Sequence, residues 1–192
     1  MKKLLAIVVL GLFWSNVSFT DDIVDYEIEG ISLGNSLLNY FSEKKIKEGI
    51  REDYYTDYNT DEFLKVEFWN LNLKVYDVFS AHIKKNDKKY IAYEISGAIL
   101  FEENISDCYP KKNEIDKDIS LQFPNAERFD SGRQIHPGGK TKKSSYDRVD
   151  FEFLSGNSID IICYDWSEET KFSDHLSVGI ESREFSKWLN DD

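Results

Sequence analysis

The sequence predicts an α+β fold, in which an antiparallel sheet of about five strands is built from two hairpins and carries helices on one face. Two pairs of strand-like segments are each joined by a short polar turn, and other segments have the apolar spacing of helices. The strands are connected by hairpins rather than by regular helical crossovers. This argues against a doubly wound parallel sheet and against the nucleotide-binding sites of such sheets.

The composition is that of a folded, acidic protein. The chain has 192 residues, of which 41% are hydrophobic and 15% aromatic, and its formal net charge is −12. This aromatic content excludes a disordered chain, and the length fits one domain. Because nucleic-acid-binding proteins need a basic surface to displace counterions, the acidic balance argues against a nucleic-acid partner.

Residues 1–20 have the three parts of a secretory signal peptide. Met1–Lys3 is positively charged, Leu4–Trp14 is almost entirely apolar, and Ser15–Thr20 is mostly small or polar. A membrane helix needs about 20 apolar residues, more than this run provides, although an uncleaved N-terminal anchor is the alternative. We therefore expect one exported domain at 21–192, periplasmic or secreted, with no stable membrane span once the signal peptide is removed.

The first half of this domain is expected to contain both short strands and short helices. Residues 25–30 predict a short strand, and residues 35–50 predict two short helical pieces, the second capped by Ser42. The polar, tyrosine-rich segment 51–62 predicts a loop. A further strand is expected at 64–69.

The clearest pattern is a hairpin formed by residues 74–84 and 89–101. A three-residue turn at Asn86–Lys88 sets Phe79 opposite Ile95, whereas a two-residue turn would set an apolar residue opposite a charged one. Since the buried face fixes the register, we expect the three-residue turn.

A helix is predicted at 107–123, with Ser106 as its cap. Cys108, Ile115 and Ile119 lie on one helical stripe. This stripe is expected to pack on the sheet.

The rest of the chain predicts an exposed loop at 125–146 and a second hairpin. The alternation at 148–153 and a turn at 155–157 set Val149 opposite Cys163.

A last strand at about 175–181 and a short helix at 183–190 complete the fold. The two hairpin registers and the helical stripe together predict the core. Its expected members are Phe79, Ile83, Ile91, Ile95, Ile99, Ile115, Ile119, Phe151, Phe153, Ile159 and Ile161.

The two cysteines are expected to form a disulfide. Cys108 lies on the apolar stripe of the predicted helix, and Cys163 lies on the inward face of a predicted strand. Both therefore point into the same interface, and an exported protein folds in an oxidising compartment. Two buried free thiols are the alternative.

The outward face of the first hairpin offers a candidate contact surface at Tyr76, His82 and Glu94. The predicted register places His82 diagonal to Glu94, within reach of an imidazole–carboxylate contact. A solvated sheet face explains the same pattern. The protein is thus interpreted as a non-catalytic binding or interaction module, for which a periplasmic protein is the candidate partner and the ligand is unknown.

A catalytic alternative is a small serine hydrolase that uses Ser32. Gly30–Gly34 matches G-x-S-x-G, the turn that exposes a nucleophilic serine in many hydrolases. The base would be one of the three histidines, whose ring nitrogen must lie about 3 Å from the serine hydroxyl. Whether the chain is an enzyme stays open, and the binding module is favoured.

The sequence predicts no metal site and no cofactor. His82, His136 and His175 are isolated in sequence. Residues 57–61 resemble the start of a calcium loop, but Glu62 stands where the loop needs glycine and Phe68 where it needs a bidentate glutamate.

The chain as a whole resembles small exported proteins of marine alphaproteobacteria, a group without a known function. The resemblance depends on the signal peptide and on the segments IEGISLGNSLLNYFSE, KKNDKKYIAYEISG and CYDWSEE. It implies export but no particular activity.

Export can be tested directly by mass spectrometry of the protein recovered from its own cells. We expect a mature chain that begins near Asp21, because the polar region ends at Thr20. A mature protein that retains Met1–Trp14 would contradict the signal-peptide prediction.

Overall fold

The computed structural model describes most of the chain after the predicted signal peptide. The described residues are 23, 26–51, 62–69, 71–101, 104–137 and 143–190. The predicted signal peptide at 1–20 and the calcium-like segment at 57–61 lie outside them, as does most of the loop predicted at 51–62. None of the helices formed by the described residues is long and apolar enough to span a membrane.

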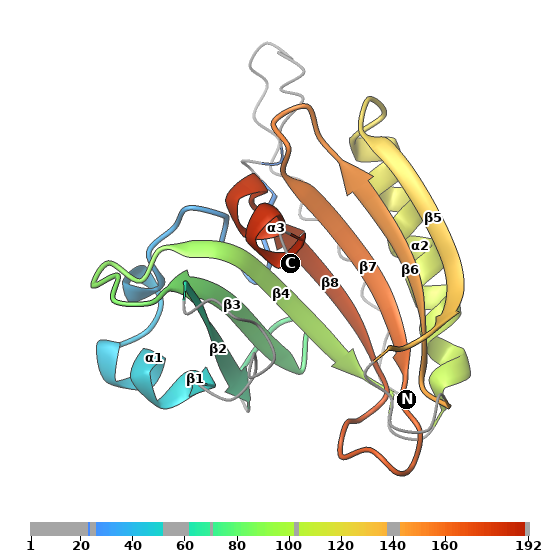
Figure 1. Ribbon diagram of the computed structural model, residues 1–192, viewed down its shortest axis with the longest axis horizontal. Helices are drawn as coiled ribbons and strands as arrows, with labels where there is room; N and C mark the ends of the chain where they lie inside the picture. Colours follow the sequence, from blue (N-terminus) through green and yellow to red (C-terminus); the bar gives the residue numbers. More distant parts are fainter. Residues whose placement is uncertain are drawn as a thin grey trace.

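The described residues form one antiparallel sheet of eight strands, in the order β1-β2-β3-β4-β8-β7-β6-β5. The strands are β1 (Ile50–Arg51), β2 (Phe63–Trp69), β3 (Val78–Lys84), β4 (Ala92–Leu100), β5 (Glu127–Ile135), β6 (Ser145–Glu152), β7 (Ser158–Asp165) and β8 (His175–Glu181). The helices are α1 (Glu43–Gly49), α2 (Cys108–Gln122) and α3 (Arg183–Asn190). The predicted single antiparallel sheet is confirmed, and Figure 1 shows its twist, but the expectation of about five strands is wrong.

The most conspicuous missed strand is β5, which the sequence predicts as part of a loop at 125–146. Nearly all of its side chains are exposed, so it lacks the apolar alternation that marks a half-buried strand. It lies at the edge of the sheet and contains a bulge at Gly132, whose φ of 58° favours glycine. Polar composition and a bulge are typical of protected edge strands, and because of them the sequence pattern does not predict β5.

The N-terminal segment is partly as predicted. Of the strand expected at 25–30, the described residues 26–30 form only an isolated bridge between Ile28 and Ile31. The two helical pieces are confirmed as a 3-10 turn at Leu37–Asn39 and α1, and the Ser42 hydroxyl accepts a hydrogen bond from the backbone N–H of Lys45.

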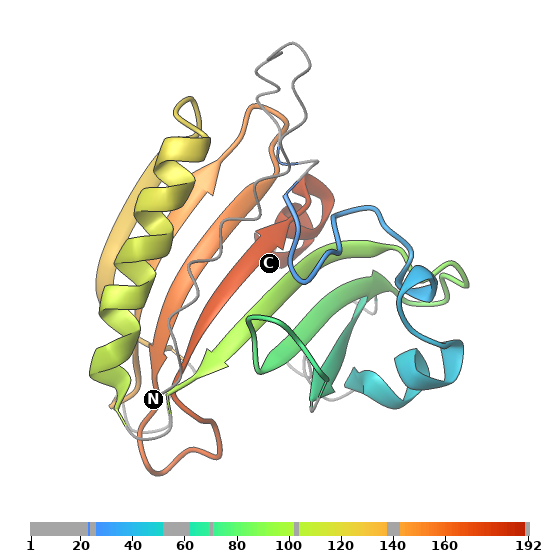
Figure 2. The ribbon, with the colours of Figure 1, turned by 180° about the vertical axis from the view of Figure 1, so that it is seen from behind.

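The helices do not share one face of the sheet, which corrects the sequence prediction. α2 packs on the core face, where Cys108 is bonded to Cys163 of β7. α3 packs on the opposite face, where Phe185 stacks on the His82 ring with 4.5 Å between centroids. Figures 1 and 2 show α2 and α3 on opposite sides. Phe185 and Phe63 belong to a small second apolar cluster on that side, which gives α3 its own packing surface.

The first hairpin has a register two residues away from the prediction. Phe79 lies opposite Gly97 instead of Ile95. The ladder shifts between His82 and Ile83, so the turn between the strands is longer than the alternation alone suggests.

The register of the second hairpin also differs from the prediction by two residues. Val149 lies opposite Ile161 rather than Cys163. The turn after Glu152 is longer than three residues, and β7 begins only at Ser158. A shift of two residues keeps each side chain on its predicted face, because side chains alternate with a period of two.

The core therefore contains most of the predicted residues. Those buried are Phe79, Ile83, Ile95, Ile119, Phe151, Phe153, Ile159 and Ile161. Ile99 and Ile115 are partly buried against them, and Ile91 is intermediate. The sequence missed the contribution of the N-terminal segment, from which Ile28, Ile31 and Leu37 also enter the core.

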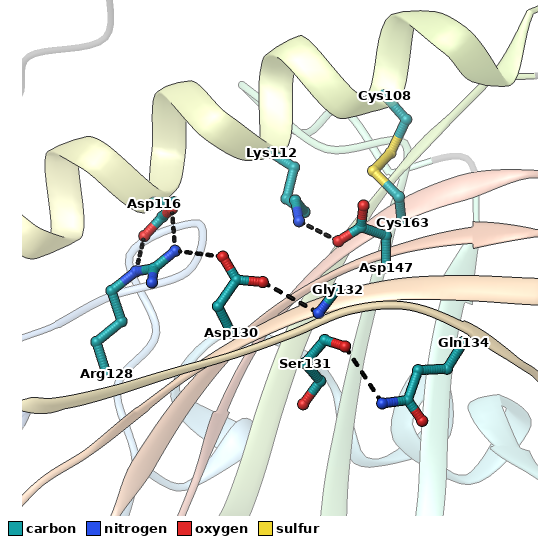
Figure 3. Close-up of polar contacts among 10 residues, drawn as sticks. All are labelled: Cys108, Lys112, Asp116, Arg128, Asp130, Ser131, Gly132, Gln134, Asp147 and Cys163. Atoms are coloured by element: carbon teal, nitrogen blue, oxygen red, sulfur yellow. Dashed lines mark hydrogen bonds and ion pairs between the residues drawn. A yellow bond between two sulfur atoms is a disulfide. The ribbon is translucent and has the colours of Figure 1, made fainter.

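Helix α2 is fastened to the sheet covalently and by ion pairs (Figure 3). The predicted disulfide between Cys108 and Cys163 is confirmed, with a Cα–Cα distance of 6.0 Å. Lys112 pairs with Asp147 of β6 one helical turn further along. The predicted Ser106 cap is wrong, because the Asn104 side chain caps the 3-10 turn that precedes α2.

Removing the disulfide should destabilise the fold strongly. The bond closes a loop of 55 positions, so the double variant Cys108→Ser with Cys163→Ser should lose about 4 kcal/mol of unfolding free energy. Urea denaturation with and without reductant measures this. Reductant should weaken the wild type and leave the double variant unchanged, and equal stability of the two proteins under oxidising conditions would contradict the account.

Candidate functional site

The face of the sheet opposite the core holds an unusual group of charged side chains. We call it the polar cluster; its members come from β3, β4, β6, β7 and β8. They are His82, Glu94, Arg148, Asp150, Asp160 and Glu181. Three of them are at least nine-tenths buried, which is rare for ionisable side chains.

His82 and Glu94 form a buried pair at one side of the cluster. The His82 Nδ1 atom lies 2.6 Å from Glu94 Oε2, and the two residues are only 5% and 6% exposed. They are directly opposite across β3 and β4, rather than diagonal as predicted. With Phe185 stacked on the imidazole ring, the pair is held rigidly between the sheet and α3.

Carboxylates face one another across the neighbouring strands. Glu94 lies directly opposite Glu181, and Asp150 lies directly opposite Asp160. Like charges in such positions destabilise a sheet. Two contacts offset part of this repulsion: Arg148 donates to Asp150 at 2.6 Å, and the hydroxyl of a serine in α3 donates to Glu181 at 2.8 Å.

Asp160 is the member without a partner. It is only 8% exposed, and within the described part of the chain no hydrogen bond reaches its carboxyl group, on which Arg148 acts through its charge alone. Its position is fixed by the residue opposite, Gly179: a Cβ atom there would lie 2.6 Å from Asp160 Oδ1. The absence of a side chain at Gly179 therefore makes the space that the carboxyl group occupies.

The surroundings raise the pKa of both central carboxyl groups. Burial raises the pKa of Asp160 well above its ordinary value, the nearby charge of Glu181 adds to this, and Arg148 opposes it. Burial also raises the pKa of Glu181, where the hydrogen bond from Ser186 opposes the shift and Glu94 adds to it. Burial and the neighbouring carboxylates thus disfavour the charged forms of both groups.

A group of aromatic rings continues the same face toward the other end of the strands. We call it the aromatic strip; it consists of Tyr146, Tyr164, His175, His136, Trp166 and Phe172. Tyr164 stacks on His175, with 4.8 Å between centroids, and on Trp166. Phe172 is 63% exposed. The buried indole N–H of Trp166 has no hydrogen-bond partner among the described residues.

The structure separates the three residues of the predicted contact surface. His82 and Glu94 are in contact, but Tyr76 lies on the core face, where a Cβ atom at Gly97 would be 2.4 Å from its ring. The reason is local: β3 begins only at Val78, so the alternation of the strand does not extend back to Tyr76.

Ser32 lies in a turn on the core face, between buried Ile31 and partly buried Leu33. Among the described residues no hydrogen bond joins its hydroxyl to a histidine. His82 and His175 belong to strand positions on the opposite face. The ring of His136 packs against Tyr146, Tyr164 and Trp166 on that same face, so none of the three histidines is placed beside Ser32.

Sequence reasoning missed four members of the cluster, namely Arg148, Asp150, Asp160 and Glu181. The alternation in the second hairpin does place the first three on the outward face. Their meeting with Glu94 depends on the pairing of β4 with β8, which no short-range pattern reveals.

In the described part of the chain, no three His, Cys, Asp or Glu side chains form a group that could hold a metal ion.

Comparison with known proteins gives no relative from which a role could be inferred. No family model, no curated protein and no solved structure matches the chain. The functional conclusion therefore depends on the geometry of the polar face.

Replacing Asp160 by its neutral isostere should stabilise the protein at neutral pH. Folding raises the pKa of this carboxyl group, so its ionisation opposes folding at every pH above the ordinary value of 3.8. Asp160→Asn should therefore raise the free energy of unfolding at pH 7 by about 1 kcal/mol or more. Below pH 3.8 the group is protonated in both states, so the difference should disappear there.

Urea denaturation at pH 7 and at acidic pH measures this difference. The matched control is Glu152→Gln, an exposed carboxylate at the end of β6, which should change stability by less than about 0.5 kcal/mol. A loss of stability in Asp160→Asn at pH 7 would show that the carboxylate is a structural partner, contrary to our interpretation.

Proposed function

We propose that the protein is an exported, non-catalytic binding module whose ligand binds at the polar cluster. The observation that carries the proposal is the buried, unpaired carboxyl group of Asp160. Buried ionisable groups with strongly shifted pKa values are concentrated at functional sites. A group of this kind, centred among like charges, is most simply explained by a ligand that completes its interactions.

The main stabilising features of the fold lie on the other face of the sheet from the polar cluster. The opposite face contains the hydrophobic core and the disulfide. Well-packed apolar residues usually stabilise a buried position as well as, or better than, a group of charges. The polar cluster is therefore a feature that stability alone does not account for, as expected for a site that serves binding.

Two further observations support an exported binding module. A disulfide persists in an oxidising compartment, which agrees with export. Two of the histidines make other contacts: His82 lies against Glu94, and His175 lies 2.8 Å from the backbone oxygen of Ser173. The candidate partner is a periplasmic protein or a small molecule.

Native mass spectrometry of the protein isolated from its own cells tests this proposal. We expect a species heavier than the free chain, because a ligand that completes the cluster should remain bound through gentle purification. Asp160→Ala, which removes the carboxyl group, should lose most of this species. The matched control Lys44→Ala, on exposed α1 and on the other side of the sheet, should keep it.

Three outcomes would overturn the proposal. A free chain in every sample would mean that nothing binds, and a ligand retained equally by Asp160→Ala would place binding elsewhere. A ligand whose mass changes during incubation with the protein would indicate turnover and contradict a non-catalytic role.

A further inference from the structure

We propose that the polar cluster binds the ammonium group of an amine, with Glu94, Asp160 and Glu181 as its partners and the aromatic strip along its carbon chain. This inference depends on the proposed function and specifies the ligand. The amine can be a free polyamine or the side chain of a lysine, because both present the same chemistry.

The charges of the cluster favour a cation. Its four carboxylates are accompanied by one permanent cation, Arg148, which is hydrogen-bonded to Asp150 and also attracts Asp160. His82 can supply at most one further positive charge, next to Glu94. Lys65 lies opposite His82, and its ammonium group is 3.0 Å from the Glu67 carboxylate, so this cation is accompanied by an anion of its own. An incoming cation would relieve the remaining repulsion.

The three proposed partners lie on the adjacent strands β4, β8 and β7. Glu94 is directly opposite Glu181, and Asp160 is diagonal to Glu181 on the next strand. Opposite side chains have Cβ atoms about 5 Å apart and diagonal ones about 7 Å. An ammonium group has three donors and forms bonds of about 2.8 Å to carboxylates, so one group can contact carboxylates of side chains that lie this close together.

Several side chains of the cluster remain accessible to solvent. Asp160 is 8% exposed, and Glu181, Asp150 and Ser96 are only partly buried. Gly179 leaves the space that the Asp160 carboxyl group occupies, because the Cβ atom of any other residue there would displace it. The unpaired acceptor is therefore both reachable and fixed before a ligand arrives, which reduces the entropy lost on binding.

The aromatic strip favours an extended organic amine over a simple inorganic cation. Tyr164 follows Asp160 by four residues on the same face of β7, a separation of about 13 Å along the strand. Burial lowers the pKa of His175, with the hydrogen bond to Ser173 opposing it, and burial alone lowers the pKa of His136. Both rings are thus uncharged at neutral pH, and the strip can attract a second cationic group through its π faces.

Isothermal titration calorimetry of the exported protein, freed of any ligand by mild acid and returned to neutral pH, tests the proposal. The probes are spermidine, a short lysine-containing peptide, fully N-acetylated spermidine and calcium chloride. We expect spermidine or the lysine peptide to bind and the acetylated analogue to bind at least about tenfold more weakly, because acetylation removes the charge. The stronger of the two binders identifies the source of the amine.

Three variants test whether the amine binds at the polar cluster. Asp160→Asn should weaken amine binding by about tenfold to a hundredfold while remaining folded by circular dichroism. Gly179→Ala, which displaces the same carboxyl group, should weaken it in the same direction. The control Glu152→Gln, exposed at the end of β6, should bind within about twofold of the wild type.

Binding of neither amine, equal binding of the acetylated analogue, tighter binding of calcium than of either amine, or unchanged binding by Asp160→Asn would overturn the ammonium assignment. If native mass spectrometry still shows a ligand that depends on Asp160, the proposed function stands and only the ligand class is wrong. If it shows none, both proposals fail together.

Discussion

The pairing of β4 with β8 is the contact on which the rest of the structure depends. It joins the strands β1–β4 to the strands β5–β8 and thereby makes one sheet from two halves of the chain. On the core face it places Ile95 against Ile180, two fully buried side chains. On the other face it places Glu94 against Glu181. The same register therefore builds the core and brings together the carboxylates of the polar cluster.

The two faces of this junction have opposite effects on stability. Apolar burial on the core face is the dominant favourable contribution, and the disulfide at Cys163 restricts the unfolded chain. The polar face brings like charges together and leaves Asp160 buried without a partner. Natural proteins often sacrifice stability at sites that bind a ligand, because the interactions are completed only in the complex. The strain of the polar face is thus the main evidence for a function.

Much of the fold could be predicted from local patterns in the sequence, but the site could be predicted only in part. Strand alternation identified the inward face at Phe79 and Phe151, and the helical stripe with export identified the disulfide. Alternation also placed His82 and Glu94 on one face. It could not find β5, whose exposed side chains carry no apolar pattern, or the pairing of β4 with β8, which joins distant segments. Such pairings depend on the packing of the whole sheet, so Asp160 and Glu181 became part of a site only in the structure.

The central claim is that folding places the Asp160 carboxyl group in an environment that disfavours its charge. A pH titration of its carboxyl carbon by 13C NMR measures this directly. We expect the pKa to lie above the ordinary value of 3.8 and to fall when Glu181→Gln removes the neighbouring negative charge. A pKa at or below 3.8, unaffected by Glu181→Gln, would show that the carboxylate is well solvated or paired, and would contradict the account.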